Sequence, residues 1–371
     1  MRIAFDIASL AACGGAERQA LEVASGLCER RHDVLLIVNK AAGQYAEYLD
    51  RLPVKELHRS SRFDVRVVSD IRHTLREFRA DVCVCERFNA SLWGRLAAAS
   101  LGCRVVVAEH ATRAQTPLAI RITNRSLGAV TESVIACAEA QVDSLVRGGH
   151  QLGKITVVRN GVDVERFARD DQGAANVRAE LGVPLGAPVV GLVAAHRPEK
   201  RHDRFISLIE RLNDAGIEVW GLMVGAGPLE ARNSSMARAS RAAGRLVVTG
   251  ARSDMPAVYS ATDAVVLVSD DIETFPLCFL EAQACGVPVV GLDTGGVRET
   301  MLEGQTGYLV DRDDLDGMCS VVAELLVDRD RRVSMGRAGR EFVARELSRD
   351  AMIDGYARVL ERETAAGRRR S

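Results

Sequence analysis

Short apolar runs alternate with helix-like segments along the chain, and this rhythm restricts the fold more than any other feature. The runs have the length and composition of buried strands. They cover residues 3–7, 34–38, 65–68, 82–85, 105–108, 134–136, 155–158, 189–195, 220–224, 247–250, 264–268, 287–290 and 307–310. Amphipathic segments follow most of them, and helices end the chain. A repeated strand–helix order predicts parallel sheets covered by helices on both faces.

The rhythm is interrupted once, near the middle. An Asn-Gly turn dipeptide lies at 160–161, and residues 168–176 are polar and rich in Gly and Ala. A chain of 371 residues is long enough for two ordinary domains. We therefore predict one domain at residues 1–168 and another at 169–350, followed by a terminal helix and frayed tail at 351–371.

The composition indicates a folded protein, with 47% apolar and 27% charged residues. No apolar run approaches ~20 residues, so no membrane-spanning helix is expected. The first six residues lack a signal-peptide pattern, and the nine cysteines show no metal-ligand spacing. Such cysteines are typical of buried thiols in a reducing compartment. The expected location is therefore the cytoplasm.

Charge is spread unevenly along the chain. The first 160 residues carry 22 basic and 17 acidic side chains, whereas the remaining residues carry 27 and 33. A basic N-terminal half favours an anionic acceptor or an anionic membrane surface. Ordinary solvated faces account equally well for so modest a difference.

The stretch from residue 264 to residue 290 reads as strand, loop, helix and strand. Ligands of parallel sheets bind where strands end and loops lead into helices. A helix N-terminus there offers free N–H groups and a positive dipole end to a diphosphate. Glu273 precedes the expected helix at 277–285, and Glu281 lies about two turns inside it. The two carboxylates could reach different parts of one elongated ligand. On spacing alone, two surface glutamates beside a helix are the simpler interpretation.

The surrounding residues favour the ligand. From Glu273 to Val290 the chain reads Glu-Thr-Phe-Pro-Leu-Cys-Phe-Leu-Glu-Ala-Gln-Ala-Cys-Gly-Val-Pro-Val-Val. This stretch resembles the nucleotide-sugar signature of the retaining glycosyltransferases of family 4, which have the GT-B fold. The resemblance implies two Rossmann-like domains facing a central cleft, with an acceptor-binding N-terminal domain, a donor-binding C-terminal domain and a last helix that returns to the first domain. It implies Glu273 at the donor sugar and Glu281 on the ribose hydroxyls.

Other loops resemble family loops around the donor. Gly-Gly-Ala-Glu at 14–17 is similar to the first loop, Gly-Ala-Gly-Pro at 225–228 to a turn before a helix, and residues 251–256 to the loop beside the base. The resemblance implies donor contacts from Gly14, Gly15, Gly225, Arg252, Thr274, Phe275, Pro276 and Leu277. The family often has Gly at 274 and 276. Pro276 has no N–H to donate, so one contact is expected to differ. Taken alone, the glycine pairs are plain turns.

A histidine and two cations complete the expected reaction site. Glu109-His110 resembles the family's post-strand histidine, which implies that His110 contacts the donor sugar, whereas a lone histidine is usually structural. Arg197 and Lys200 follow a strand, where fixed cations could stabilise a leaving diphosphate. Lys200 matches the family lysine. The family arginine, five residues earlier, is Ala195 here, so Arg197 is the expected substitute, and a solvated basic turn is the alternative.

Acceptor contacts are predicted from Glu86, Arg87 and Arg113, which otherwise read as surface charges. No Asp-x-Asp lies in the donor stretch from 264 to 290, where Ser-Asp-Asp at 269–271 lacks metal-site spacing. We therefore expect no metal and no cofactor beyond the nucleotide sugar. Lys200, Arg197 and the helix dipole at residue 277 would stabilise the leaving group.

The resulting prediction is a retaining hexosyltransferase that makes a cell-surface glycan, polysaccharide or glycolipid. Its acceptor would be a glycan, a lipid-linked sugar or a small molecule, not nucleic acid, and its N-terminal domain would contact the inner face of a membrane. Two alternatives stay open. A GT-B epimerase or hydrolase would need further acid–base groups, and a non-catalytic sugar-nucleotide-binding protein would not need Lys200 beside two carboxylates.

Overall fold

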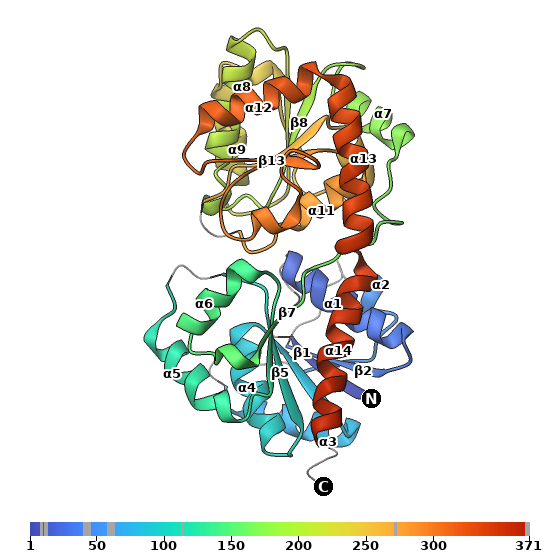
Figure 1. Ribbon diagram of the computed structural model, residues 1–371, viewed down its shortest axis with the longest axis vertical. Helices are drawn as coiled ribbons and strands as arrows, with labels where there is room; N and C mark the ends of the chain where they lie inside the picture. The colour runs from blue at the N-terminus through green and yellow to red at the C-terminus, as the bar shows by residue number, and fades with distance from the viewer. Residues whose placement is uncertain are drawn as a thin grey trace. The chain divides into compact units, whose positions relative to one another are not determined.

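The computed structural model describes the chain apart from residues 8–9, 11–13, 40–45, 58–63, 113–114, 271–272 and 368–371. The chain forms two compact units (Figure 1). Unit 1 contains residues 1–160 and 349–371, and unit 2 contains residues 161–348.

Unit 1 is built on a seven-stranded parallel sheet with the order β3-β2-β1-β4-β5-β6-β7. Its strands are β1 Arg2–Ile7, β2 Asp33–Val38, β3 Val54–Glu56, β4 Val82–Glu86, β5 Arg104–Glu109, β6 Ser133–Ala136 and β7 Ile155–Val157. Its helices are α1 Gly15–Glu29, α2 Ala46–Leu49, α3 Arg66–Phe78, α4 Arg87–Ala99, α5 Leu118–Ser126, α6 Val142–Arg147 and α14 Arg349–Gly367.

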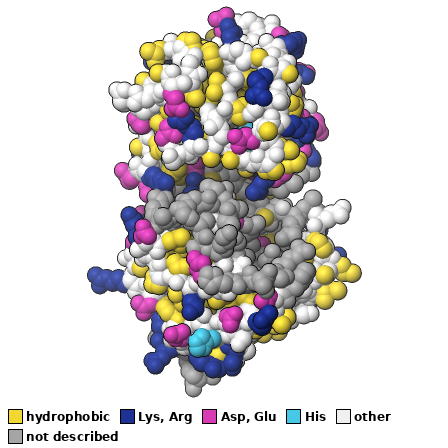
Figure 2. Space-filling model, turned by 180° about the vertical axis from the view of Figure 1, so that it is seen from behind, with side chains coloured by type: hydrophobic (Ala, Val, Ile, Leu, Met, Phe, Trp, Pro, Cys, Tyr) yellow, Lys and Arg dark blue, Asp and Glu magenta, His cyan; other side chains and the backbone are white. Residues whose placement is uncertain are grey.

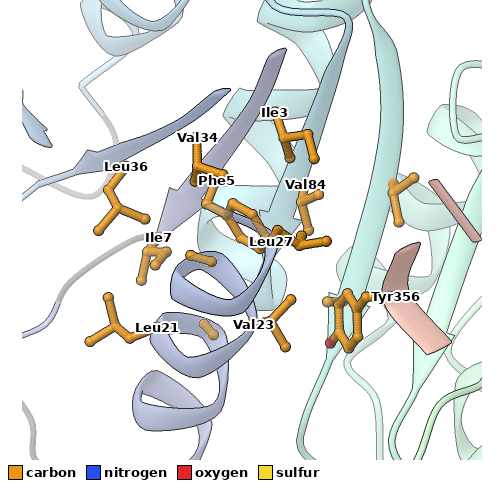
Figure 3. Close-up of a cluster of buried hydrophobic side chains, with 14 of the residues drawn as sticks. Ile3, Phe5, Ile7, Leu21, Val23, Leu27, Val34, Leu36, Val84 and Tyr356 are labelled. Atoms are coloured by element: carbon orange, nitrogen blue, oxygen red, sulfur yellow. The ribbon is translucent and has the colours of Figure 1, made fainter. Parts of the chain in front are cut away.

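Alternate residues of β1 supply the two cores of this unit, because successive side chains of a strand point to opposite faces. Ile3, Phe5 and Ile7 pack in a cluster with residues of α1 and α14. Figure 3 shows these side chains meeting those of α1, with Tyr356 of α14 beside them. Ala4 packs on the other face with residues of α3 and α4. The sheet is therefore covered on both faces.

Unit 2 is built on a six-stranded parallel sheet with the order β10-β9-β8-β11-β12-β13. Its strands are β8 Val189–Val193, β9 Trp220–Val224, β10 Leu246–Val248, β11 Ala264–Leu267, β12 Val289–Leu292 and β13 Gly307–Val310. Its helices are α7 Asp171–Glu180, α8 His202–Asp214, α9 Glu230–Ala239, α10 Met255–Ser260, α11 Leu277–Ala284, α12 Leu315–Val327 and α13 Arg329–Glu346. The two parallel α/β halves expected from the strand–helix rhythm are confirmed.

Two local predictions differ from the structure. The strand expected at 65–68 is wrong, because these residues open helix α3, which buries Val67, Ile71 and Leu75 at four-residue spacing. Adjacent valines imitate a strand when only the short run is considered. Strand β3 was not expected, since it is a three-residue edge strand with little buried apolar surface.

The units divide earlier than the predicted boundaries at 168/169 and 350/351. The first crossing lies after residue 160 and the second after residue 348. Val162 donates its backbone N–H to the Leu347 carbonyl at 3.0 Å. The ring of Phe167 lies 6.3 Å from that of Tyr259, measured between centroids. Residues 161–168 therefore pack as part of unit 2 and do not form a free linker.

Helix α14 returns to unit 1, as expected, and is held there by charge and by packing. Arg349 donates to Glu22 at 2.7 Å and to both oxygens of Glu29 at 2.9 Å. Ile353 is fully buried against α1. Opposite it stands Gly26, where a Cβ atom would overlap the Ile353 side chain. The glycine thus allows α1 and α14 to approach closely.

This packing predicts a reversal of sign in a double-mutant cycle. Gly26→Ala in the native protein should lower the free energy of unfolding by about 1–3 kcal/mol through overpacking. In an Ile353→Ala background the same change should be neutral or stabilising, since alanine then fills vacated space and favours helix by up to ~1 kcal/mol. Urea unfolding of the four proteins measures both effects. Equal costs in both backgrounds would contradict the close contact.

Candidate functional site

The loops that follow β8 and β11 meet at the carboxyl edge of the unit 2 sheet. The two strands are parallel neighbours, with Ala264 opposite Val190. Asp270 donates its backbone N–H to the Glu199 carbonyl at 2.9 Å. A main-chain hydrogen bond therefore links the two loops independently of their side chains.

Lys200 and Glu273 form an ion pair between these loops, with Lys200 Nζ donating to Glu273 Oε1. The Glu273 side chain is 7% exposed and that of Lys200 is 24% exposed. The carbonyl of Glu273 accepts from the Gly296 N–H at 3.0 Å. Gly295 adopts φ +54°, and a Cβ there would overlap the Glu273 carbonyl oxygen. The fold thus brings Lys200 and Glu273 together. The loop at Gly295 and Gly296 lies directly against the main chain of Glu273, which the absence of a Cβ allows.

Glu281 lies on the buried face of α11, where a carboxylate needs a partner. The hydroxyl of Tyr259, on α10, donates to Glu281 Oε2 at 2.6 Å. Both residues are buried. Thr274 and Phe275 are also buried, and Pro276 is the last residue before α11. Tyr259 was not among the predicted residues, because no spacing in the sequence links it to Glu281.

Gly225 lies where the ends of three strands crowd together. It has φ +146°, and a Cβ there would overlap the carbonyl oxygen of Ala194. Its N–H donates to the Gly250 carbonyl at 2.8 Å. Only glycine fits this position, so the loop after β9 can lie directly against the loops after β8 and β10.

The predicted cations differ in their surroundings. Arg252 donates to both carboxylate oxygens of Glu180, at 2.7 and 2.8 Å, and to Asp254 at 2.7 and 2.9 Å. Arg197 is exposed and lines a cavity of about 570 Å³ together with Arg232 and Asp270. Lys200 does not line this cavity. A role for Arg197 at a phosphate and for Arg252 beside a base both stay predictions.

Arg201 was missed by the sequence analysis and links the same two loops. It has φ +48° and ψ +50°, a backbone conformation that glycine adopts more easily. Its guanidinium contacts Asp203 at 2.8 Å and Asp270 at 3.1 Å. The contacts of the Arg201 side chain therefore offset the energetic cost of its backbone conformation.

In unit 1 the edge of the sheet near α1 and β5 carries the remaining predicted residues. Gly14 precedes α1 in an extended conformation, and a Cβ there would overlap the buried carboxylate of Glu17. Gly15 is the first residue of α1. Arg113 lies outside the described residues, as does the side chain of Arg87, the first residue of α4.

His110 follows β5 and forms a buried ion pair with Glu86 at the end of β4. His110 Nε2 lies 3.0 Å from Glu86 Oε2, and the side chains are 4% and 2% exposed. Burial alone lowers the pKa of His110. The charge of Glu86, its hydrogen bond to His110 and the nearby Cys137 outweigh burial and raise that pKa to about 10. Glu86, which is predicted to contact the acceptor substrate, thus forms an ion pair with His110.

Comparisons with known proteins identify the family. The model of Glycosyltransferase Family 4 matches residues 13–166, and that of Glycosyl transferases group 1 matches residues 174–342. The chain thus joins a glycosyltransferase family 4 domain to a glycosyl transferases group 1 domain.

Two curated relatives show what the chain is similar to. A GDP-mannose-dependent alpha-(1-6)-phosphatidylinositol monomannoside mannosyltransferase of Mycobacterium tuberculosis is 33% identical over 219 residues, which cover 56% of this chain and 55% of that protein. A D-inositol 3-phosphate glycosyltransferase of Corynebacterium urealyticum is 31% identical over 248 residues, covering 62% and 56%. The chain spans about half the length of the curated relatives it matches.

Solved structures of similar glycosyltransferases share the fold. A glycosyltransferase from Rickettsia africae superposes with a TM-score of 0.86 at 19% identity, over 97% of this chain and 98% of that one. Anabaena HepE in complex with UDP-glucose gives 0.85 at 20% identity, over 97% and 99%. The expected GT-B fold class is confirmed.

Replacing Glu86 tests the ion pair of this glycosyltransferase directly. In Glu86→Gln, burial prevails, and the pKa of His110 should fall below the ordinary value of about 6.5. Because the pKa of His110 is raised in the folded protein, the ion pair should add to the free energy of unfolding below pH ~6.5. This contribution should be lost as the pH rises through ~10. This loss should vanish in the variant. NMR titration of the imidazoles, with urea unfolding from pH 7 to 10, measures both.

His150 is an internal control for this titration. Burial and the nearby Arg95 lower the pKa of His150 to about 4. Its titration should be the same in both proteins, and His110→Gln identifies the His110 resonance. A His110 that titrates near 6.5 in the native protein would contradict the pair.

Proposed function

We propose that the protein is a retaining glycosyltransferase that moves a sugar from a nucleoside-diphosphate sugar to an acceptor hydroxyl. The observation that carries the proposal is the Lys200–Glu273 ion pair next to the start of α11. A cation, a carboxylate and a helix N-terminus at one edge of a parallel sheet suit a ligand that carries a diphosphate beside a sugar.

The ion pair suggests how the donor is received. Lys200 is a point charge that suits a phosphate oxygen, and Glu273 suits sugar hydroxyls. Without a donor, each neutralises the other and avoids an unpaired, partly buried charge. When the diphosphate takes over Lys200, the Glu273 carboxylate turns to the sugar. The exchange replaces one ionic contact by another, so its cost is small.

The nucleoside would be held deeper along α11. Glu281 would accept hydrogen bonds from the ribose hydroxyls, and Tyr259 would fix the carboxylate through its bond to Oε2. Gly225 would let the nucleoside approach the strand ends.

The reaction itself needs little from protein side chains. The bond from the anomeric carbon to the diphosphate oxygen breaks, and its electron pair stays on the diphosphate. The acceptor hydroxyl attacks from the same face, and its proton passes to the leaving phosphate oxygen. Lys200, Arg197 and the α11 dipole would stabilise the growing negative charge, so no metal ion is required. A contact of His110 with the donor sugar stays a prediction.

The relatives suggest the class of acceptor. Their names refer to phosphatidylinositol monomannoside and inositol 3-phosphate, which are anionic. The basic excess of the first 160 residues suits such an acceptor. We propose a phosphate-bearing, lipid-linked acceptor at the inner face of the membrane.

In the part of the chain that the structure describes, no helix is long and apolar enough to cross a bilayer. An epimerase or hydrolase of the same fold is the alternative.

A thermal-shift screen with UDP, GDP, ADP and their sugar conjugates tests the donor site. A ligand at a hundred times its Kd adds ~2.7 kcal/mol, which raises Tm by roughly 5–10 °C. Only one base series should produce this shift in the native protein. Lys200→Ala should lose most of it, because the diphosphate contact is gone, and Glu281→Ala should lose the ribose contact.

Arg238→Ala, which removes an exposed cation from α9, is the matched control and should retain the shift. A native shift that survives Lys200→Ala would reject the diphosphate contact. No shift with any nucleotide would reject the proposed function as a whole.

Metal removal tests how the leaving group is stabilised. Sugar transfer in excess EDTA should keep the rate seen without chelator, since fixed cations replace a metal ion. Lys200→Ala should lower kcat by about 100-fold or more, the cost of losing one preorganised contact to developing charge. Loss of transfer in EDTA with recovery on adding Mg²⁺ or Mn²⁺ would overturn the metal-independent mechanism. Donor cleavage that does not depend on acceptor would favour a hydrolase.

A further inference from the structure

The cavity of about 570 Å³ in unit 2 has a lining that the proposed function does not use. The lining comes from the loop after β8 and the start of α8, from α9 and the residue before it, and from Asp270. Helices α8 and α9 lie side by side on one face of the sheet (Figure 1). Of the described residues that line the cavity, Arg197 alone is also proposed for the donor reaction. Its other residues therefore need an explanation of their own.

The loops that frame this cavity are tied together by the main chain. His196 donates its N–H to the Ala226 carbonyl at 3.1 Å, and the His196 carbonyl accepts from the Leu229 N–H at 3.0 Å. A Cβ at Gly227 would overlap the backbone of His196, so the two loops lie in direct contact. Sites for small molecules are usually preformed in this way and span ~300–1,000 Å³. The cavity is of the size and construction of a ligand site.

Part of the charge in the lining is balanced within the protein. Arg201 contacts Asp203 at 2.8 Å and Asp270 at 3.1 Å. Arg204, just outside the lining, contacts the same Asp270 at 3.4 Å. Two guanidinium groups thus compensate two carboxylates, and this side of the cavity leaves no net charge for a ligand.

Two arginines and one carboxylate of the lining are not balanced in this way. Arg197 and Arg232 are exposed, and Glu199 is partly exposed. None of the three side chains forms an ion pair or a hydrogen bond with the residues that the structure describes. By contrast, basic and acidic side chains lie interspersed over the face of unit 2 that Figure 2 shows. The cavity therefore offers two cations and one carboxylate to a ligand.

A buried histidine pair adds neutral polar groups to the same cavity. His202 lines it, is 2% exposed and stacks on the fully buried His196, with ring centroids 4.2 Å apart. Asn233, which also lines the cavity, donates to His196 Nδ1 at 2.9 Å. Neither ring nitrogen of His202 is in hydrogen-bonding geometry with a described residue. Burial and the nearby His196 lower the pKa of His202 to about 4, so the ring is neutral at neutral pH.

These groups suit a ligand that combines a phosphate with hydroxyl groups. A phosphate monoester carries roughly −1.5 to −2 charges at pH 7 and three strong acceptor oxygens. Guanidinium groups bind such oxygens in pairs, and Arg197 and Arg232 supply two of them. Glu199 would repel a bare anion, whereas its carboxylate can accept a hydrogen bond from a hydroxyl. The lining thus favours a hydroxylated ester over inorganic phosphate.

We propose that this cavity binds a hydroxylated phosphate monoester, such as a sugar phosphate, and that its occupancy controls the donor site. The phosphate contacts Arg197 and Arg232, and a hydroxyl contacts Glu199. Glu199 precedes Lys200 in the turn Pro198–Lys200, so the ester holds the loop that presents the donor lysine. It also withdraws Arg197 from the leaving diphosphate. The binding rests on the cavity alone, whereas the control rests on the proposed function.

Isothermal titration calorimetry of the full chain without nucleotide tests the binding. The probes are glucose 6-phosphate, inorganic phosphate and glucose. The native protein should bind glucose 6-phosphate, bind inorganic phosphate more weakly and leave glucose unbound. Arg232→Gln should weaken glucose 6-phosphate binding by roughly tenfold or more, because a charge-assisted contact is lost. Glu199→Ala should bring the affinities for the ester and for inorganic phosphate closer together, since it removes both the hydroxyl contact and the repulsion.

Two control variants separate this cavity from the donor site and from general charge. Arg238→Gln removes an exposed cation from α9, the helix that also carries Arg232. Lys200→Ala removes the donor lysine, which does not line the cavity. Both should bind glucose 6-phosphate nearly as the native protein does. The two arginine variants change exposed residues, so each should keep the native Tm.

Nucleotide titrations with and without the ester test the control. Saturating glucose 6-phosphate should raise the Kd of the nucleoside diphosphate by about fivefold or more, and linkage requires the nucleotide to raise the Kd of the ester by the same factor. In Arg232→Gln, the ester concentration that saturates the native cavity should leave the nucleotide Kd nearly unchanged.

Three outcomes would overturn the cavity site. They are no binding of glucose 6-phosphate, equal native affinities for glucose 6-phosphate and inorganic phosphate, and binding that Lys200→Ala abolishes but Arg232→Gln retains. A nucleotide Kd that the ester does not change would overturn the control of the donor site. A protein that binds the ester but no nucleotide would refute the proposed function and leave the cavity site intact.

Discussion

Two neighbouring parallel strands that end at the same edge position the residues of the proposed donor site. Because β8 and β11 pair in parallel, their loops emerge together, and the main-chain bond from Asp270 to Glu199 joins them. On that base, Lys200 meets Glu273, and Arg201 bridges to Asp270. Each of these partly buried charges offsets the other, so the ion pair links the two loops through their side chains as well. Preorganised charge is what a transfer reaction with a departing diphosphate requires.

Much of the fold could be predicted from the sequence, because a buried parallel strand must be apolar along its length. The predictions failed where a local pattern competed with tertiary packing. Three valines within residues 65–68 imitate a strand, but the spacing of Val67, Ile71 and Leu75 favours a helix. The domain boundary was placed too late because nothing local shows that Phe167 packs against Tyr259. Tertiary contact, and not composition, decided both.

The candidate site was predictable in its residue types and less so in its partnerships. Glu281 and Lys200 were expected from the resemblance to the family, because spacing alone fitted a surface glutamate and a solvated basic turn equally well. Which group holds each side chain depends on distances that only the folded chain sets. Tyr259 is 22 residues from Glu281, and Glu86 is 24 from His110. The left-handed backbone of Arg201 could not be predicted from the sequence, because this conformation is usually adopted by glycine.

Helix α5 shows how a buried charge can shape a surface. The sequence periodicity defines which residues of a helix share a face, but it does not say which face turns inward. Arg95 settles the matter, because a guanidinium without water needs acceptors, and Asn124 supplies one. Leu118 and Ile122 of the same helix then point outward, at a cost in exposed apolar area. A hydrogen bond inside unit 1 thus determines which side chains its surface exposes.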